Sequence, residues 1–125
     1  MAYRGLPPIS LTAAADTTGI NSGNYTNYFS SAVLGALKMP YFEWYHATVT
    51  NVPAGATCTI YQNLTYRWGA TSPQLGVSEY APPGGMVMNP GWEIAFCWST
   101  GSGTKPIVTL FFRYDVDDPA NQANM

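Results

Sequence analysis

The sequence predicts a mainly β protein, an antiparallel β-sandwich of the jelly-roll or immunoglobulin-like kind. Hydrophobic and polar residues alternate over stretches of strand length, most clearly from Trp92 to Ser99. Turns rich in glycine and proline separate these stretches at intervals of about ten residues. Aromatic residues, which favour strands, make up 14% of the chain. With 125 residues the chain has the size of one domain, so a single sandwich is expected.

Residues 1–24 are expected to form an extended N-terminal arm. Pro7 and Pro8 favour polyproline or edge conformations, and the small and polar residues from Thr12 to Asn24 offer little to pack. Such a segment either becomes ordered on a neighbouring molecule or remains disordered, and the composition allows both outcomes.

One segment, 25–37, has the spacing of a short amphipathic helix. Asn24 is a suitable N-cap, and Pro40 would end the helix. Gly35 and several weak helix formers oppose this assignment, so a pair of strands is the alternative. The helical stripe consists of Tyr25, Tyr28, Phe29, Ala32, Val33, Ala36 and Leu37.

Strands are expected from Tyr41 onward, and they complete a sandwich domain over 25–116 that is followed by a polar tail, 117–125. The last strand is apolar on both faces, so we expect it to be central or to meet a partner. The expected strands are 42–52, 57–68, 75–80, 86–88, 92–99 and 105–116. The core candidates are Trp92, Ile94, Phe96, Trp98, Val108, Leu110, Phe112 and Tyr114.

The two cysteines, Cys58 and Cys97, both lie in expected strands. The N-terminus has no apolar signal-peptide region, and no apolar run is long enough to span a membrane. We therefore expect a protein made and kept in a cytoplasm, or in something assembled there, with free thiols. An inter-sheet disulfide is the alternative, because the order Cys58, Trp68, Cys97 is similar to that of immunoglobulin domains.

The charge content limits the possible partners. Only 10% of the residues are charged, whereas about a quarter is usual for a soluble domain. The cationic residues are scattered along the chain and the net charge is -2, so we expect no nucleic-acid partner. The surface must be covered by uncharged polar residues or be partly hidden against a partner.

No residue pattern points to an enzyme. His46 is the chain's one histidine, and neither cysteine has the surroundings of a catalytic nucleophile. The carboxylates that could serve a glycosidase or bind calcium are more simply solvent-facing positions or a solvated strand end. They are Glu43, Glu79, Glu93, Asp115, Asp117 and Asp118. We expect no catalytic residues, no metal site and no cofactor.

The aromatic residues outside the expected core exceed what one small core can hold. Exposed Trp and Tyr either stack on sugar rings or anchor protein interfaces. The low charge favours a protein interface, because the centres of such interfaces are depleted of Lys, Glu and Asp. The aromatic residues are Trp44, Tyr45, Tyr61, Tyr66, Trp68 and Tyr80.

The layout of the whole chain resembles that of capsid decoration, or cement, proteins of tailed bacteriophages. The shared features are a Met-Ala start without a signal, the arm with Pro7-Pro8, the sandwich-like tract from Phe42 to Val116, and turns such as Asn89-Pro90-Gly91. The resemblance implies a non-enzymatic virion protein that binds the major capsid protein or another virion protein on the outer shell and stabilises it, often as a trimer. It also implies assembly in the host cytoplasm. A phage tail or baseplate component is a variant of this hypothesis.

Two other functions remain open at this point. A carbohydrate-binding module would use Trp44, Tyr66 and Trp68 as its platform, and a small hydrolase would use Glu43, His46 and Glu93. For the favoured hypothesis, the interface candidates come from the arm and from the aromatic strands. They are Tyr3, Arg4, Leu6, Ile9, Leu11, Trp44, Tyr45, Tyr66 and Trp68.

Overall fold

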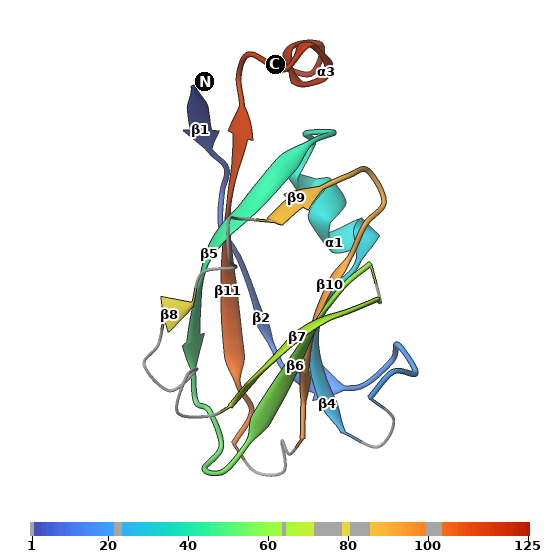
Figure 1. The fold of residues 1–125 in the computed structure, drawn as a ribbon, viewed down its shortest axis with the longest axis vertical. Coiled ribbons are helices and arrows are strands. Elements are labelled where there is room, and N and C mark those ends of the chain that lie inside the picture. Colours follow the sequence, from blue (N-terminus) through green and yellow to red (C-terminus); the bar gives the residue numbers. More distant parts are fainter. Residues whose placement is uncertain (1, 22–23, 64, 72–78, 81–85, 100–103) are drawn as a thin grey trace.

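The computed structural model describes residues 2–21, 24–63, 65–71, 79–80, 86–99 and 104–125, and at 65–71, 79–80 and 86 it describes the backbone alone. These residues form two antiparallel sheets packed face to face, with short helices at one end (Figure 1). The predicted β-sandwich is confirmed.

Each sheet is built from strands distant in sequence. Within the described residues, the six-stranded sheet has the order β1-β11-β5-β8, with β2 also on β11 and β9 also on β5. The five-stranded sheet has the order β3-β4-β10-β6-β7. The strands of the first are β1 (Tyr3–Gly5), β2 (Ile9–Thr12), β5 (Phe42–Thr50), β8 (Glu79–Tyr80), β9 (Met86–Met88) and β11 (Ile107–Asp115). Those of the second are β3 (Ala14–Ala15), β4 (Tyr25–Phe29), β6 (Thr57–Gln62), β7 (Thr65–Thr71) and β10 (Ile94–Trp98).

The core lies between the two sheets and is filled by alternate residues of the long strands. Strand β11 alternates between buried and half-buried positions along its whole length, as the sequence predicts. Aromatic rings meet edge to face across the core, with ring centroids 5.6 Å apart for Trp44 and Phe96 and 5.3 Å apart for Phe42 and Phe112. Trp92 is only half-buried at the margin of this core.

Strand β10 is buried on both faces, which its alternating sequence does not predict. It lies between β4 and β6 at the centre of its sheet. On the outer face, Ala95 is opposite Tyr28 on one side and Tyr61 on the other. The small methyl group is fully buried between these neighbours.

The N-terminal segment is extended, but its partner is its own domain. Strand β1 pairs with β11 from Tyr3 to Gly5, and β2 pairs with the same strand further along. Ala13 is buried in the core. The expectation of an arm received by a neighbour or left disordered is therefore wrong for the described part of 1–24.

The expected helix over 25–37 is largely replaced by a strand. Tyr25–Phe29 is β4, and only Ser31–Leu34 (α1) and Gly35–Leu37 (η1, a 3-10 turn) are helical. Ser30 is the N-cap of α1, because its Oγ accepts a hydrogen bond from Val33 N. Pairing with β10 overrides the helical spacing, since β4 supplies that strand with its second neighbour.

A buried amide in β4 links the two sheets. Asn27 is 0% exposed, and its Nδ2 donates to the carbonyl oxygens of Leu11 (2.8 Å) and Pro106 (3.2 Å). Its Oδ1 accepts from Trp98 Nε1 at 2.6 Å. This network joins Asn27 to β2, to the segment before β11 and to β10. Asn27 makes these contacts from a strand.

The C-terminal tail ends in a short helix that is fixed to the sandwich. Helix α3 (Pro119–Gln122) begins after Asp118, whose Oδ1 accepts from Ala120 N at 2.9 Å. Asn121 is 1% exposed; its Nδ2 donates to Asp115 O, and its Oδ1 accepts from Tyr41 N. The tail therefore holds the end of β11 beside the start of β5.

The two cysteines are free and buried. The register places Cys58 opposite Trp98 and Cys97 opposite Thr59, so the two side chains lie on different faces of the sheet. Burial raises the pKa of Cys97 to about 12, with a smaller contribution from the Asp16 carboxylate. Burial also raises the pKa of Cys58. The prediction of free thiols is confirmed.

We expect both thiols to resist alkylation in the native protein. At about pH 8 an unperturbed cysteine has an appreciable thiolate fraction, which the raised pKa values of Cys58 and Cys97 remove. Iodoacetamide labelling followed by intact-mass measurement should show no adduct in native buffer and two adducts in denaturant. Rapid labelling of the native protein would contradict the buried positions.

Candidate interaction surface

The outer face of the six-stranded sheet carries aromatic side chains around an ion pair. Arg113 and Glu43 form a bidentate pair, with Nη2–Oε1 and Nε–Oε2 distances of 3.1 Å each. The Arg113 guanidinium lies 4.3 Å from the ring centroid of Tyr3 and 5.0 Å from that of Tyr45. These contacts hold a long, flexible side chain in one position on the surface.

The strand registers bring these residues into one row. Val87 of β9 is opposite Glu43 of β5, and Glu43 is opposite Arg113 of β11. Strand alternation turns these side chains outward, because their neighbours Phe42 and Phe112 are buried in the core. The outer face therefore combines residues far apart in the sequence.

A β-bulge decides how β5 presents its aromatic residues. The register with β11 shifts between Phe111 and Phe112, so that His46 is opposite Phe111 and Trp44 is opposite Phe112. Tyr45 is the extra residue, and Tyr45 and His46 are both half-buried while Trp44 is 0% exposed. The bulge thus places Trp44 in the core and Tyr45 on the outer side of the sheet.

The ion pair favours the charged form of the Arg113 guanidinium. The hydrogen bond from Arg113 to Glu43 raises the pKa of the guanidinium, against a smaller opposing effect of burial. The Tyr3 and Tyr45 hydroxyls raise the pKa of Arg113 further. The guanidinium therefore stays cationic beside these rings.

A hollow of about 250 Å³ lies at the end of this face, beside α3. Three large apolar side chains that line it are exposed: Tyr3 by 45%, Tyr41 by 38% and Val87 by 63%. Among the described residues, the one other exposed large hydrophobic side chain is Met125. We call this site the Tyr3–Tyr41 hollow; its other lining residues are Phe42, Glu43, Arg113, Tyr114, Asp115, Asp118 and Asn121.

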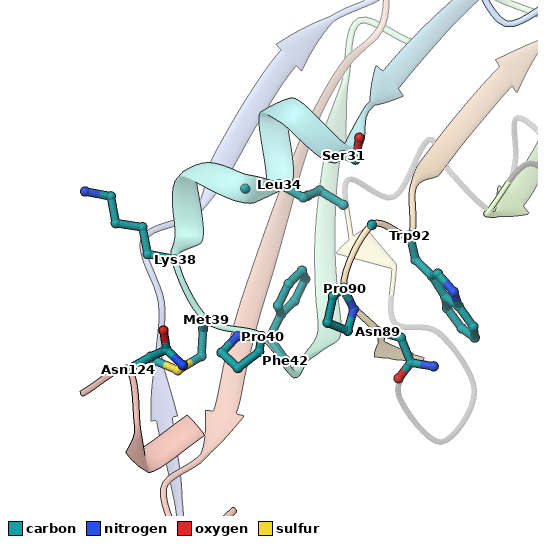
Figure 2. Close-up of a pocket in the computed structure, with 12 residues that line it drawn as sticks. Ser31, Leu34, Lys38, Met39, Pro40, Phe42, Asn89, Pro90, Trp92 and Asn124 are labelled. Atoms are coloured by element: carbon teal, nitrogen blue, oxygen red, sulfur yellow. The ribbon is translucent and has the colours of Figure 1, made fainter. Parts of the chain in front are cut away.

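A second hollow, of about 350 Å³, lies between α1–η1 and the turn at Asn89–Gly91. Figure 2 shows Leu34 and Phe42 pointing into it, while Lys38 and Trp92 extend to opposite sides. None of the exposed large hydrophobic side chains lines it. The Tyr3–Tyr41 hollow is therefore the stronger candidate for an interaction site, because exposed apolar side chains gather there.

The interface residues predicted in the arm lie in two different environments. Tyr3 lines the Tyr3–Tyr41 hollow, whereas Arg4 is exposed on β1 and is not among the residues that line the hollow. Leu6, Ile9 and Leu11 are instead half-buried against the core of their own domain. They cover the sandwich that β2 completes, and their role in contacting a neighbour stays a prediction.

The aromatic interface candidates also lie in different environments. Tyr45 contacts Arg113 on the outer face. Trp44 is in the core, where its Nε1 donates to His46 O at 2.9 Å, so its assignment to an interface or a sugar platform is wrong. The side chains of Tyr66 and Trp68, opposite Tyr61 and Ile60 in the register, lie outside the described part.

Sequence reasoning missed Tyr41, Val87 and Arg113. Tyr41 precedes β5, and Val87 lies in a strand of three residues, so neither has a pattern that assigns it a face. Arg113 does have a signal in the sequence. It is the one charged residue in the mainly apolar stretch 107–114, and such a residue requires a partner or solvent. Its partner, Glu43, comes from a strand far away in the sequence.

The candidate hydrolase residues do not converge. Glu43 is bound to Arg113 on the outer face of one sheet. Glu93 lies at the start of a strand in the other sheet, where its Oε2 accepts from Ser31 N at the start of α1. Burial and a hydrogen bond with Glu93 raise the pKa of Tyr28 to about 12. His46 contacts the ring of Phe111, with centroids 5.3 Å apart.

Three further findings bear on function. Within the described ranges, no three His, Cys, Asp or Glu side chains are grouped so that they could hold a metal ion. The same ranges contain no helix long and apolar enough to cross a membrane. No protein-family model matches the sequence, and neither a curated protein nor a solved structure is significantly similar to it. Function is therefore inferred from the surface of this chain itself.

Proposed function

We propose that this protein is a non-enzymatic structural component of a virion that binds the outer capsid surface and stabilises the shell. The observation that carries the proposal is the gathering of Tyr3, Tyr41 and Val87, all exposed, around the Arg113–Glu43 pair. Tyrosine and arginine are the residue types most often found where binding energy concentrates in protein interfaces. The partner is the major capsid protein or another virion protein, as the resemblance of the chain's layout implies.

The mechanism is one of linkage. A protein that binds the assembled shell, and not its free subunits, shifts the equilibrium toward the shell by mass action. Burying the Tyr3–Tyr41 hollow at a seam between shell subunits removes apolar area from water. The low charge of the chain reduces the cost of desolvation over the rest of the contact.

Two polar groups of the hollow, Asn121 and Glu43, are engaged within the fold, which favours a protein partner over a sugar. Both ends of the Asn121 amide are bonded to the backbone of this chain, at Asp115 O and Tyr41 N. Both oxygens of Glu43 accept from Arg113. Sugar hydroxyls require directed donors and acceptors, which these groups already use for the fold.

Replacing Tyr3, Tyr41 and Val87 together by serine should weaken attachment to shells by about 100-fold, because each side chain contributes apolar contact area at the centre of the interface. Shells of the parent virus assembled without this chain are mixed with purified protein, and bound protein is quantified after sedimentation. Saturable binding of the unaltered chain is expected.

The matched control is Met125→Ser, which removes an exposed apolar side chain that does not line the hollow. It should bind as the unaltered chain does. Failure of the unaltered chain to bind shells contradicts the proposed function. Equal binding of the triple variant contradicts the assignment of the surface. The native mass of the free protein tests the expected trimer.

A further inference from the structure

We propose that the Tyr3–Tyr41 hollow receives one basic side chain, a lysine or an arginine, from the protein that it contacts. This inference rests on the proposed function, because it specifies the chemistry of the partner at the same surface. The observation behind it is that the hollow combines negative charge, exposed aromatic rings and a volume suited to one side chain.

The charge of the hollow is negative once its internal ion pair is taken into account. Glu43 and Arg113 neutralise one another through their bidentate contact. Asp115 and Asp118 also line the hollow, and neither has a salt-bridge partner among the described residues. Their hydrogen bonds come from backbone amides, with Asp115 Oδ1 accepting from Asp117 N and Asp118 Oδ1 from Ala120 N, both at 2.9 Å. With no cation of the described residues paired to them, these two carboxylates attract one.

The aromatic rings of the hollow suit the same ligand. Cations bind over the faces of tyrosine rings, and the Arg113 guanidinium already does so with Tyr3 at 4.3 Å. Tyr41 provides a second exposed ring, close enough to α3 for its backbone amide to donate to Asn121. A basic group entering the hollow would meet rings and carboxylates together.

The size and the apolar part of the hollow fit a side chain with an aliphatic stem. Its volume is about 250 Å³. Pockets for small molecules are usually larger, about 300–1,000 Å³. Val87 is exposed on one side, and the buried rings of Phe42 and Tyr114 contribute to the lining. Lysine and arginine stems pack against such apolar surface while their charged ends remain with polar groups.

The test uses the full chain and a small probe, N-acetyl-arginine methylamide, whose charge lies in the side chain alone. NMR titration should shift the side-chain signals of Tyr3, Tyr41 and Val87. The uncharged N-acetyl-norleucine methylamide should bind at least about tenfold more weakly, because it has the stem without the cation. Raising NaCl from about 50 to about 500 mM should weaken binding of the arginine probe.

The decisive variant is Asp115→Asn with Asp118→Asn. Asparagine keeps the side-chain oxygen that caps α3 at Asp118 and the one that accepts from Asp117 N, so the variant removes charge and preserves the fold. Affinity for the arginine probe should fall at least about tenfold. Asp117→Asn is the matched control, since this exposed carboxylate does not line the hollow.

The outcomes separate this inference from the proposed function. Equal binding of the norleucine probe, or unchanged affinity in the double variant, would overturn the inference. So would an effect of Ca²⁺ on Asp115 and Asp118 that occurs without any response to the arginine probe. If the double variant still binds shells normally, the inference fails and the proposed function stands. If the arginine probe binds but the unaltered chain does not bind shells, the proposed function fails.

Discussion

Replacing Asn27 by leucine is expected to lower the free energy of unfolding by about 4 kcal/mol. The side chain is 0% exposed and satisfies the carbonyl oxygens of Leu11 and Pro106 and the indole N–H of Trp98. Leucine leaves the buried indole N–H of Trp98 without its partner, which costs about 1–3 kcal/mol, and removes one hydrogen bond each, worth about 1 kcal/mol, from Leu11 O and Pro106 O. Pro106 O keeps its bond from Ala13 N. Urea unfolding followed by circular dichroism measures the change.

The control for size is Asn27→Asp, which keeps the shape but removes both donors of the amide. Burial should raise the pKa of the new carboxyl group above its unfolded value of about 3.9. The variant should therefore lose stability as the pH rises above about 4, since the unfolded state then ionises more readily. Asn124→Leu changes an exposed amide and should cost less than about 0.5 kcal/mol. A loss below about 1 kcal/mol for Asn27→Leu would contradict the network.

Deleting residues 2–12 is expected to unfold most of the protein rather than release a separate arm. The deletion removes β1 and β2 from β11 and exposes the core that Leu6, Ile9 and Leu11 cover. It also removes the Leu11 carbonyl that Asn27 binds. These losses sum to about 5 kcal/mol, comparable with the whole stability of a small domain. Thermal unfolding by circular dichroism should show no cooperative transition.

Point variants within β2 keep this prediction testable if the deletion variant is insoluble. Ile9→Ser with Leu11→Ser should lower the free energy of unfolding by about 3 kcal/mol, because both side chains pack against the core. Ser10→Ala with Thr12→Ala should change it by less than about 0.5 kcal/mol, since both residues are exposed on the other face. A deletion variant that unfolds like the full chain would restore the arm interpretation.

Two of the errors in the sequence prediction, the helix over 25–37 and the free arm, have one physical origin. The helical spacing of 25–37 is real. However, β4 forms the backbone hydrogen bonds that β10 requires on one side, and it places Asn27 at the junction of the sheets. Segment 1–12 contains Pro7 and Pro8 and reads locally as an extended arm, but it pairs with β11 and packs its apolar side chains against the core. Local propensity is worth tenths of a kcal/mol per residue, and pairing with a distant strand exceeds it.

The β-sandwich class and the inward faces of β10 and β11 could be predicted from the sequence alone. These follow from alternation and composition, which are local properties of a strand. The burial of Trp44 in the core and the meeting of Tyr3, Tyr41 and Val87 in one hollow could be read only from the three-dimensional arrangement. The reason is that a bulge and the order of strands are set by contacts between distant segments, and a shift of one residue reverses the face of every side chain.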